Sequence, residues 1–310
     1  MRAPDTFFIT GAGGYIGGTV AAKLITAGSR VRGLVRNATN AALLASQGIE
    51  PVMGDLNDTA LLMREAKNAD GVINAASADH PDSVKALIAG LQDSAKPLIH
   101  TSGSSIVGDN ARGMHSSDVV YDDNTPQLVQ PFKQARRDID LMVLTAAEKG
   151  IRSIVICPSL IYGQGRGLNT KSVQIPFLVD NARECGAVQI VGVGKNVWSN
   201  VHIDDVADLY VLALAKAAAG SFLFAANGEA SFLEIGTAIA TRLNLPGVES
   251  LDPDLADSRW GVGKAHFSLG SNSRVRSVRA RAELGWSPRH TSAVDWILKE
   301  MPIDSNTIQN

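Results

Sequence analysis

The stretch FFITGAGGYIGGTVAAKL near the N-terminus constrains the fold more than any other part of the chain. A short β-prone run precedes three glycines, and a helix-like run follows them. The glycines are Gly11, Gly14 and Gly17. Glycine permits a tight turn and a close approach of the backbone to a ligand or a neighbouring element. The helix that starts at Tyr15 and Ile16 presents free N–H groups, which favour an anionic phosphate. The stretch therefore predicts a strand, a phosphate-binding turn and a helix.

Short apolar runs alternate with helix-like runs through the first half of the chain. The strand-like runs are residues 7–10, 30–35, 49–54, 71–76, 97–102 and 152–157. Such alternation predicts an α/β fold, a doubly wound parallel (Rossmann) sheet covered by helices on both faces. The pattern becomes irregular after residue 157. We expect a nucleotide-binding domain over 1–165, to which 200–226 return. The segments 166–199 and 227–310 are expected to form a smaller, C-terminal substrate-binding lobe.

Composition narrows the class of protein. The chain has 310 residues, 45% of them hydrophobic and 19% charged, with a net charge of −2, which is typical of a soluble globular protein. It has no basic block to bind nucleic acid and no apolar run long enough to span a membrane. Cys157 and Cys185 are too few for a disulfide framework, so a cytoplasmic location is expected. His202 has no second histidine at ligand spacing, and no metal site is predicted.

The GxxGxxG spacing resembles that of the short-chain dehydrogenase/reductase (SDR) superfamily, especially its extended, epimerase/dehydratase-like and atypical branches. The segments GDLND, NAAS and CPSLIYGQG match further family motifs in order, although Cys157 stands where the family usually has arginine. The resemblance implies a nicotinamide dinucleotide cofactor. It further implies cofactor contacts at the ends of the third, fourth and sixth strands. The residues concerned are Asp55 and Leu56 beside the adenine, Ala75 and Ala76 along the cofactor, and Pro158.

The end of the second strand indicates which dinucleotide binds. An NAD site places Asp or Glu about twenty residues after the glycines, where it binds the ribose hydroxyls. This chain has Arg36 there, with Arg32 nearby. A guanidinium can hold a 2′-phosphate through paired charged hydrogen bonds. NADP(H) is therefore the predicted cofactor, and a solvated surface arginine is the alternative.

The expected chemical centre departs from the family pattern. SDR enzymes carry Tyr-x-x-x-Lys, in which the tyrosine is the general acid or base and the lysine lowers its pKa. Counting back from Pro158 places Phe132 at the tyrosine position and Arg136 at the lysine position. Making Lys133 the family lysine puts Val129 at the tyrosine position, so neither register restores the pair. Arg136 could still bind the nicotinamide ribose, but its pKa rules out a proton shuttle.

Another group must therefore supply the proton if the chain is an enzyme. The candidates are Ser102 and Ser104 after the fifth strand, Lys133 beside Phe132, and Tyr121 in the acidic loop before that helix. Each has an ordinary structural alternative, such as a loop serine that bonds its own backbone or a solvated lysine. Asp79 and His80 follow the fourth strand, where a helix cap is the simpler explanation. We expect Phe132 to face the nicotinamide pocket as an apolar wall.

Three functions remain open at this point. The leading one is an NADPH-dependent reductase of a small carbonyl, enone or imine, with the cofactor carrying the hydride. A non-catalytic NADP(H)-binding sensor or regulator is the alternative that the missing tyrosine favours. An epimerase or dehydratase is the third, and both Phe132 and Arg36 count against it. The family habit of pairing through sheet-flanking helices suggests a homodimer.

Overall fold

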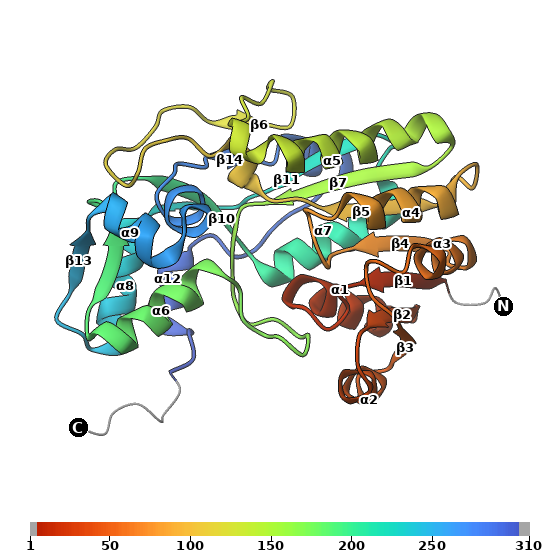
Figure 1. The fold of residues 1–310 in the computed structure, drawn as a ribbon, viewed down its shortest axis with the longest axis horizontal. Helices are drawn as coiled ribbons and strands as arrows, with labels where there is room; N and C mark the ends of the chain where they lie inside the picture. Colours follow the sequence, from red (N-terminus) through yellow and green to blue (C-terminus); the bar gives the residue numbers. More distant parts are fainter. Residues whose placement is uncertain (1–4, 304–310) are drawn as a thin grey trace.

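A seven-stranded parallel sheet forms the centre of the larger lobe in the computed structural model, which describes residues 5–303 (Figure 1). Its order is β11-β7-β5-β4-β1-β2-β3. The strands are β1 (Thr6–Thr10), β2 (Arg30–Val35), β3 (Ile49–Met53), β4 (Gly71–Asn74), β5 (Pro97–Thr101), β7 (Arg152–Pro158) and β11 (Ser221–Ala225). The order reverses between β1 and β4, where a doubly wound sheet opens a crevice at its carboxyl edge. The predicted α/β fold is confirmed.

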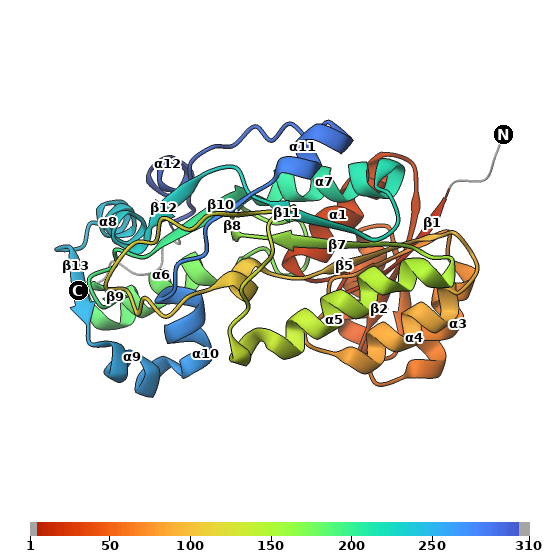
Figure 2. The same ribbon diagram turned by 90° about the horizontal axis from the view of Figure 1, so that it is seen from above.

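Helices cover both faces of this sheet (Figure 2). One face packs against α1 (Tyr15–Thr26), α2 (Ala38–Ser46), α7 (Ile203–Lys216) and α11 (Val278–Leu284). The other packs against α3 (Thr59–Asn68), α4 (Pro81–Leu91) and α5 (Gln134–Thr145). Every residue of β5 and β11 is buried. Strands buried on both faces read as continuous apolar runs, which explains why the sequence pattern located them.

The smaller lobe combines short strands with helices. A three-stranded sheet joins β12 (Glu229–Ser231), β10 (Val197–His202) and β8 (Leu160–Tyr162). A parallel pair joins β9 (Val188–Val191) to β13 (Val248–Leu251). A second parallel pair, β6 (Tyr121–Asp122) with β14 (Val275–Arg276), packs against the core of the larger lobe. The remaining helices are α6 (Gln174–Cys185), α8 (Phe232–Leu243), α9 (Pro253–Trp260), α10 (Val262–Lys264), a π-helix (Ala265–Leu269) and α12 (Ala293–Lys299). Short 3₁₀ turns occupy Ser104–Val107, Pro131–Lys133 and Ala146–Lys149.

Capping residues explain several of these boundaries. Asp58 accepts a hydrogen bond from the Leu61 N–H and begins α3. Ser231 and Glu234 form a reciprocal capping box at the start of α8. The pattern analysis did not predict the segment from α9 to the π-helix. Asp252 followed by Pro253, a cap and a first-turn proline, is the signal that marks its start.

Two further observations bear on function. Within residues 5–303, no helix combines the length and apolar character needed to cross a bilayer. The same residues contain no group of three or more His, Cys, Asp or Glu side chains placed to hold a metal ion. The outer ends of the predicted domains, residues 1–4 and 304–310, lie outside the described residues.

Candidate functional site

A pocket of about 710 Å³ lies at the carboxyl ends of β1 to β4, beside the start of α1. Its lining includes most of the residues predicted to hold the cofactor. These are Gly11, Gly14, Arg36, Asp55, Leu56, Ala75 and Ala76. Five segments that are far apart in the sequence meet here, because parallel strands end at one edge of the sheet and the loop after β8 also reaches it. Leu168 and Asn169, from that loop, complete the wall and were not expected from the sequence.

The glycines of this pocket are required by close backbone contacts. Gly11 has φ +76°, and a Cβ on it would lie 2.7 Å from the Ala75 carbonyl oxygen. A Cβ on Gly17 would lie 2.3 Å from the Gly11 oxygen, so α1 packs directly against the turn. Gly14 caps α1 and donates its N–H to the Gly11 oxygen at 2.8 Å. This cradle at a helix N-terminus fits a dinucleotide pyrophosphate.

Tyr15 and Ile16 stand in the first turn of α1, as expected, but their side chains point away from the pocket. The Tyr15 hydroxyl donates to the Gly163 carbonyl oxygen at 2.8 Å, and burial raises its pKa. Ile16 packs against the core under the sheet. Only their backbone N–H groups can therefore contribute to a phosphate site. Pro158, at the end of β7, is buried outside the lining of this pocket.

Arg32, in β2, and Arg36, just after β2, have different surroundings. Arg32 is paired with Glu50, at 3.1 Å between Nε and Oε1, and with the buried carboxylate of Glu65. Arg36 is exposed at the pocket, and no carboxylate within residues 5–303 pairs with it. The free guanidinium next to the pocket is therefore that of Arg36, with Asn40 one turn into α2 beside it.

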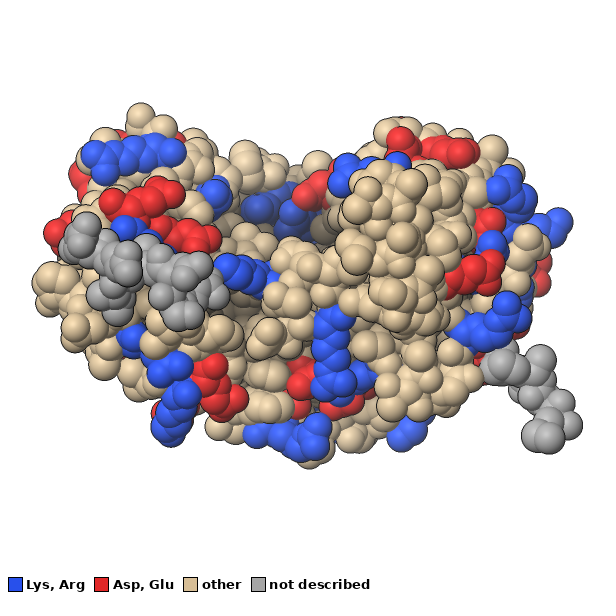
Figure 3. Space-filling view, turned by 90° about the horizontal axis from the view of Figure 1, so that it is seen from below, with Lys and Arg blue, Asp and Glu red and all other residues tan. Residues whose placement is uncertain are grey.

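A hollow opens between the two lobes, and Lys and Arg side chains lie inside it (Figure 3). Phe132, just before α5, stacks on Phe267 of the π-helix, with ring centroids 4.4 Å apart and planes 3° from parallel. Because Phe132 is 57% exposed, it forms a rim that joins the two lobes and does not form the enclosed wall that we expected. The cofactor pocket described above does not include it.

Lys133 is buried beside this aromatic pair. It is only 9% exposed, and its Nζ lies 5.4 Å from the ring centroids of both Phe132 and Phe267. Within residues 5–303 its ammonium forms no hydrogen bond or ion pair. Burial, together with the positive charge of Arg136, lowers the pKa of Lys133 to about 8, while Asp79 opposes the shift. A desolvated ammonium with a pKa near neutrality is suited to proton transfer.

Arg136 connects the start of α5 to the loops after β4 and β5. Its Nε and Nη2 donate to the two carboxylate oxygens of Asp79 at 2.8 and 2.5 Å, and Nη1 donates to the Ser105 hydroxyl at 3.3 Å. The bidentate bond to Arg136 lowers the pKa of Asp79. His80 instead caps α4, accepting from the Ser83 N–H. The pair of Asp79 and Arg136 thus ties the start of α5 to the loop after β4, close enough to Lys133 to act on its pKa.

The two predicted serines have hydrogen-bond partners inside the protein. Ser102 donates to Asp140 at 2.8 Å, and Ser104 accepts from the Ser273 hydroxyl at 2.8 Å; both serines are buried. Tyr121 lies in β6, opposite Val275, and its ring packs against the core of the larger lobe. Neither the Lys133 ammonium nor the Tyr121 hydroxyl forms a hydrogen bond within residues 5–303, and Lys133 is the more buried of the two residues.

A buried polar network beneath α5 was missed by the sequence analysis. The Thr10 hydroxyl donates to the side-chain oxygen Oδ1 of Asn74, which turns the side-chain nitrogen Nδ2 of Asn74 toward His100 Nδ1 at 3.0 Å. His100 therefore carries its hydrogen on Nε2, which faces Asp140 at 3.8 Å. Burial raises the pKa of Asp140 to about 7 and lowers that of His100 to about 4. This network ties α5, with Lys133 at its start, to β5. The one sequence signal for this network was His100, a histidine within the apolar run that forms β5.

Comparison with known proteins identifies the family. A family model described as the NAD dependent epimerase/dehydratase family matches residues 7–222. Oxidase ucsJ of Acremonium sp is 33% identical over 326 residues, which cover 91% of this chain and 92% of that protein. A 4-hydroxy-2-methyl-3-oxo-4-farnesyl-3,4-dihydroquinoline-1-oxide ketoreductase of Stigmatella aurantiaca is 22% identical over 321 residues, covering 92% of each.

The fold comparison agrees. The structure of dTDP-glucose 4,6-dehydratase from Bacillus anthracis in complex with NAD superimposes with a TM-score of 0.74 at 17% identity, covering 96% of this chain and 97% of that one. At that identity the likeness concerns the fold alone, whereas the family model and ucsJ extend it to the sequence. The chain therefore belongs to the NAD dependent epimerase/dehydratase family, within the extended branch of the SDR superfamily.

Proposed function

We propose that this protein is an NADPH-dependent reductase that transfers hydride to a small carbonyl, enone or imine, with Lys133 as the proton donor. One observation carries the proposal: the Lys133 residue is nine-tenths buried, and its ammonium has no polar partner within residues 5–303. Leaving a buried charge without a partner costs free energy, so such a group is usually retained for a function.

Each residue of the hollow has a role in this reaction. The bound reduced nicotinamide supplies the hydride. Lys133 donates a proton to the oxygen or nitrogen that becomes negative as the hydride arrives, and it is reprotonated from solvent. Phe132 and Phe267 keep water from the ammonium, which holds its pKa low. Arg136, held by Asp79, keeps the start of α5 in place.

The choice of NADP(H) rests on Arg36. Its guanidinium stands at the rim of the pocket without a carboxylate partner in the described part of the chain, where a 2′-phosphate would approach. An NAD-specific site would need a carboxylate to accept from the ribose hydroxyls at the end of β2. The only acidic residue of the pocket lining is Asp55, at the end of β3, and its Oδ1 already accepts the Asn57 N–H.

Redox chemistry is also supported by the relatives, one of which is named an oxidase and another a ketoreductase. A non-catalytic NADP(H)-binding protein is the second candidate, because Phe132 and Arg136 replace the tyrosine and lysine of the family. Phe132 and Arg36 count against an epimerase or dehydratase, which needs the tyrosine and tightly bound NAD. A homodimer and a cytoplasmic location belong to the proposal too; Cys157 and Cys185 are both free thiols, which is in keeping with a reducing compartment.

The test is a substrate panel. Purified protein is mixed with NADPH and a set of ketones, enones and imines, and the absorbance of the reduced nicotinamide is followed. The proposal expects oxidation of NADPH with at least one class, lost in Lys133→Met and kept in Lys149→Met, an exposed lysine beyond α5. Tight NADPH binding without turnover on any class would favour the sensor. Absence of dinucleotide binding would reject both.

A further inference from the structure

The loop between β8 and α6 crosses from the smaller lobe to the glycine-rich turn. Residues 163–172, which we call the clasp, run down beside α1 and return to α6 (Figure 1). A hydrogen bond of 2.9 Å from the Gly165 N–H to the Thr170 oxygen closes its neck. Its tip, residues 166–169, therefore forms a compact turn against the first turns of α1.

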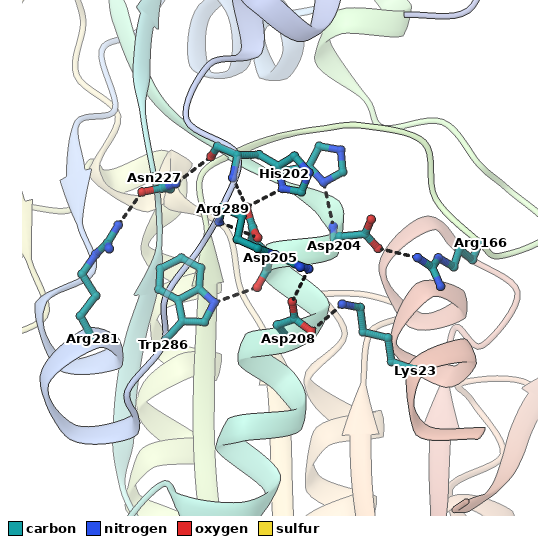
Figure 4. A network of polar contacts seen from close by, with 11 residues as sticks. Lys23, Arg166, His202, Asp204, Asp205, Asp208, Asn227, Arg281, Trp286 and Arg289 are labelled. Atoms are coloured by element: carbon teal, nitrogen blue, oxygen red, sulfur yellow. Dashed lines mark hydrogen bonds and ion pairs between the residues drawn. The ribbon is translucent and has the colours of Figure 1, made fainter. Parts of the chain in front are cut away.

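Polar contacts attach the clasp to the larger lobe at both ends of the tip. The Arg166 N–H donates to the Thr19 hydroxyl at 2.9 Å, and the Asn169 N–H donates to the Gly13 oxygen at 3.0 Å. The Arg166 guanidinium also pairs with Asp204 at 3.2 Å, at the start of α7 (Figure 4). The descending and the returning half of the loop are thus both hydrogen-bonded to elements that surround the cofactor pocket.

The tip meets α1 backbone to backbone. A Cβ on Gly167 would lie 2.2 Å from the Gly14 oxygen, and a Cβ on Gly18 would lie 2.2 Å from the Gly167 Cα. Neither position can hold a side chain without moving the loop, because both nearest atoms belong to the main chain. Gly18 is not one of the three glycines of the phosphate-binding fingerprint. Its contact with the main chain of Gly167 explains why this position also needs a glycine.

Two side chains of the tip face the dinucleotide pocket. Leu168 packs 3.3 Å from where a Gly13 Cβ would lie, and it lines the pocket with Arg36 and Asn40. Asn169 also lines it. The side-chain oxygen Oδ1 of Asn169 accepts from the Lys171 N–H at 3.1 Å, and the side-chain N–H groups of Asn169 have no partner within residues 5–303.

We propose that the clasp is part of the dinucleotide site and controls how fast the cofactor leaves. Leu168 covers the adenosine half, and Asn169 donates a hydrogen bond to a phosphate oxygen. A bound dinucleotide lies between this tip and the strand ends at Asp55 and Ala75, so it leaves only when the contacts of the tip with Gly13 and Thr19 open. The inference rests on the proposed function, since it takes the pocket to hold NADP(H).

Release of NADPH from the full-length protein tests the proposal. Leu168→Ala, Asn169→Ala and Gly167→Val are compared with the wild type and with Val173→Ala, which is 72% exposed just beyond the clasp. Bound NADPH is displaced by excess NADP⁺, and the loss of nicotinamide fluorescence is followed by stopped flow. We expect release about tenfold faster in the three variants and unchanged in the control, since changes within a site act mainly on dissociation.

Limited trypsin digestion gives a second readout, because Arg166 and Lys171 lie in the clasp. NADPH is expected to slow cleavage at these two residues in the wild type and to slow it less in Leu168→Ala. Equal release rates in all variants, with cleavage unaffected by NADPH, would refute the role of the clasp in cofactor release and leave the proposed function intact. Absence of NADPH binding to the wild type overturns both. If Gly167→Val does not fold, the other two variants decide.

Discussion

The two ends of the cleft are built differently. At the cofactor end, backbone atoms set the shape: a side chain on Gly11 or Gly17 would collide with main-chain oxygens of the turn or of β4. At the chemical end, side chains from three separate segments set the environment. Lys133 lies against its neighbour Phe132 and against Phe267, which comes from the other lobe. The cofactor end keeps the glycine pattern of the family. The chemical end has Phe132 and Arg136 where the family has tyrosine and lysine.

The contrast shows which property can change without loss of the fold. A backbone cradle tolerates few substitutions, because main-chain atoms cannot move aside. A proton donor needs only a titratable group of suitable pKa within reach of the substrate. Burial beside two stacked rings, together with the charge of Arg136, lowers the pKa of Lys133, whereas in the family a neighbouring lysine lowers the pKa of the tyrosine. The cofactor end can thus be kept while the donor is replaced.

Removing the donor has the largest expected effect and tests the chemical end. Lys133→Met should lower turnover by about 10²–10⁴-fold, the usual range for loss of acid–base catalysis, while NADPH affinity stays unchanged. Steady-state kinetics and a fluorescence titration measure the two quantities, with Lys149→Met as the control. Near-full activity of Lys133→Met would mean that water or the substrate supplies the proton, and that the chemical end has no proton donor in place of the tyrosine.

Arg36→Ala tests how the cofactor end distinguishes NADPH from NADH. It should weaken NADPH binding by about 1.5–3 kcal/mol, the scale of a charged hydrogen bond, and leave NADH binding nearly unchanged. Calorimetric titration with both cofactors measures this. Arg30→Ala, at an exposed arginine that begins β2 and lies outside the pocket, is the matched control. An equal loss for NADPH and NADH would show that Arg36 does not select the 2′-phosphate.

Gly17→Val breaks the backbone cradle. Its side chain would start 2.3 Å from the Gly11 oxygen, so α1 must shift, and the free energy of unfolding should fall by about 1–3 kcal/mol with loss of NADPH binding. Urea unfolding and NADPH titration give the result. Thr26→Val places the same branched side chain on the exposed end of α1 as a control. A variant as stable as the wild type, with wild-type affinity, is incompatible with the phosphate-loop assignment.

Phe132→Tyr has the smallest expected effect. The added hydroxyl has no lysine at position 136 to lower its pKa, so turnover should stay within about tenfold of the wild type or fall. Phe132→Leu is the informative partner, since it removes the stacked ring and admits water to Lys133, which should raise the pH at which activity declines. A large gain of activity in Phe132→Tyr would mean that the position had kept its acid–base role.

The sequence predicted the features that the backbone imposes. Glycine spacing and buried strands follow short-range rules, so the doubly wound sheet and the cofactor pocket were expected, with Arg36 and Asp55 in it. Partners of side chains depend on long-range packing. Nothing in the local pattern shows that Ser104 bonds Ser273 or that Lys133 meets Phe267. No local pattern predicts the clasp, because its contacts with α1 span about 150 residues of chain.

The pH dependence of reduction tests the central claim most directly. Lys133 donates only when protonated, and its pKa is lowered to about 8, so turnover should be constant below that value and decline above it. Lys133→Arg stays protonated at all accessible pH values and should lose this decline together with most of the activity. A profile that is flat through pH 8 in the wild type, or a decline that Lys133→Arg retains, would contradict the assignment of Lys133 as the proton donor.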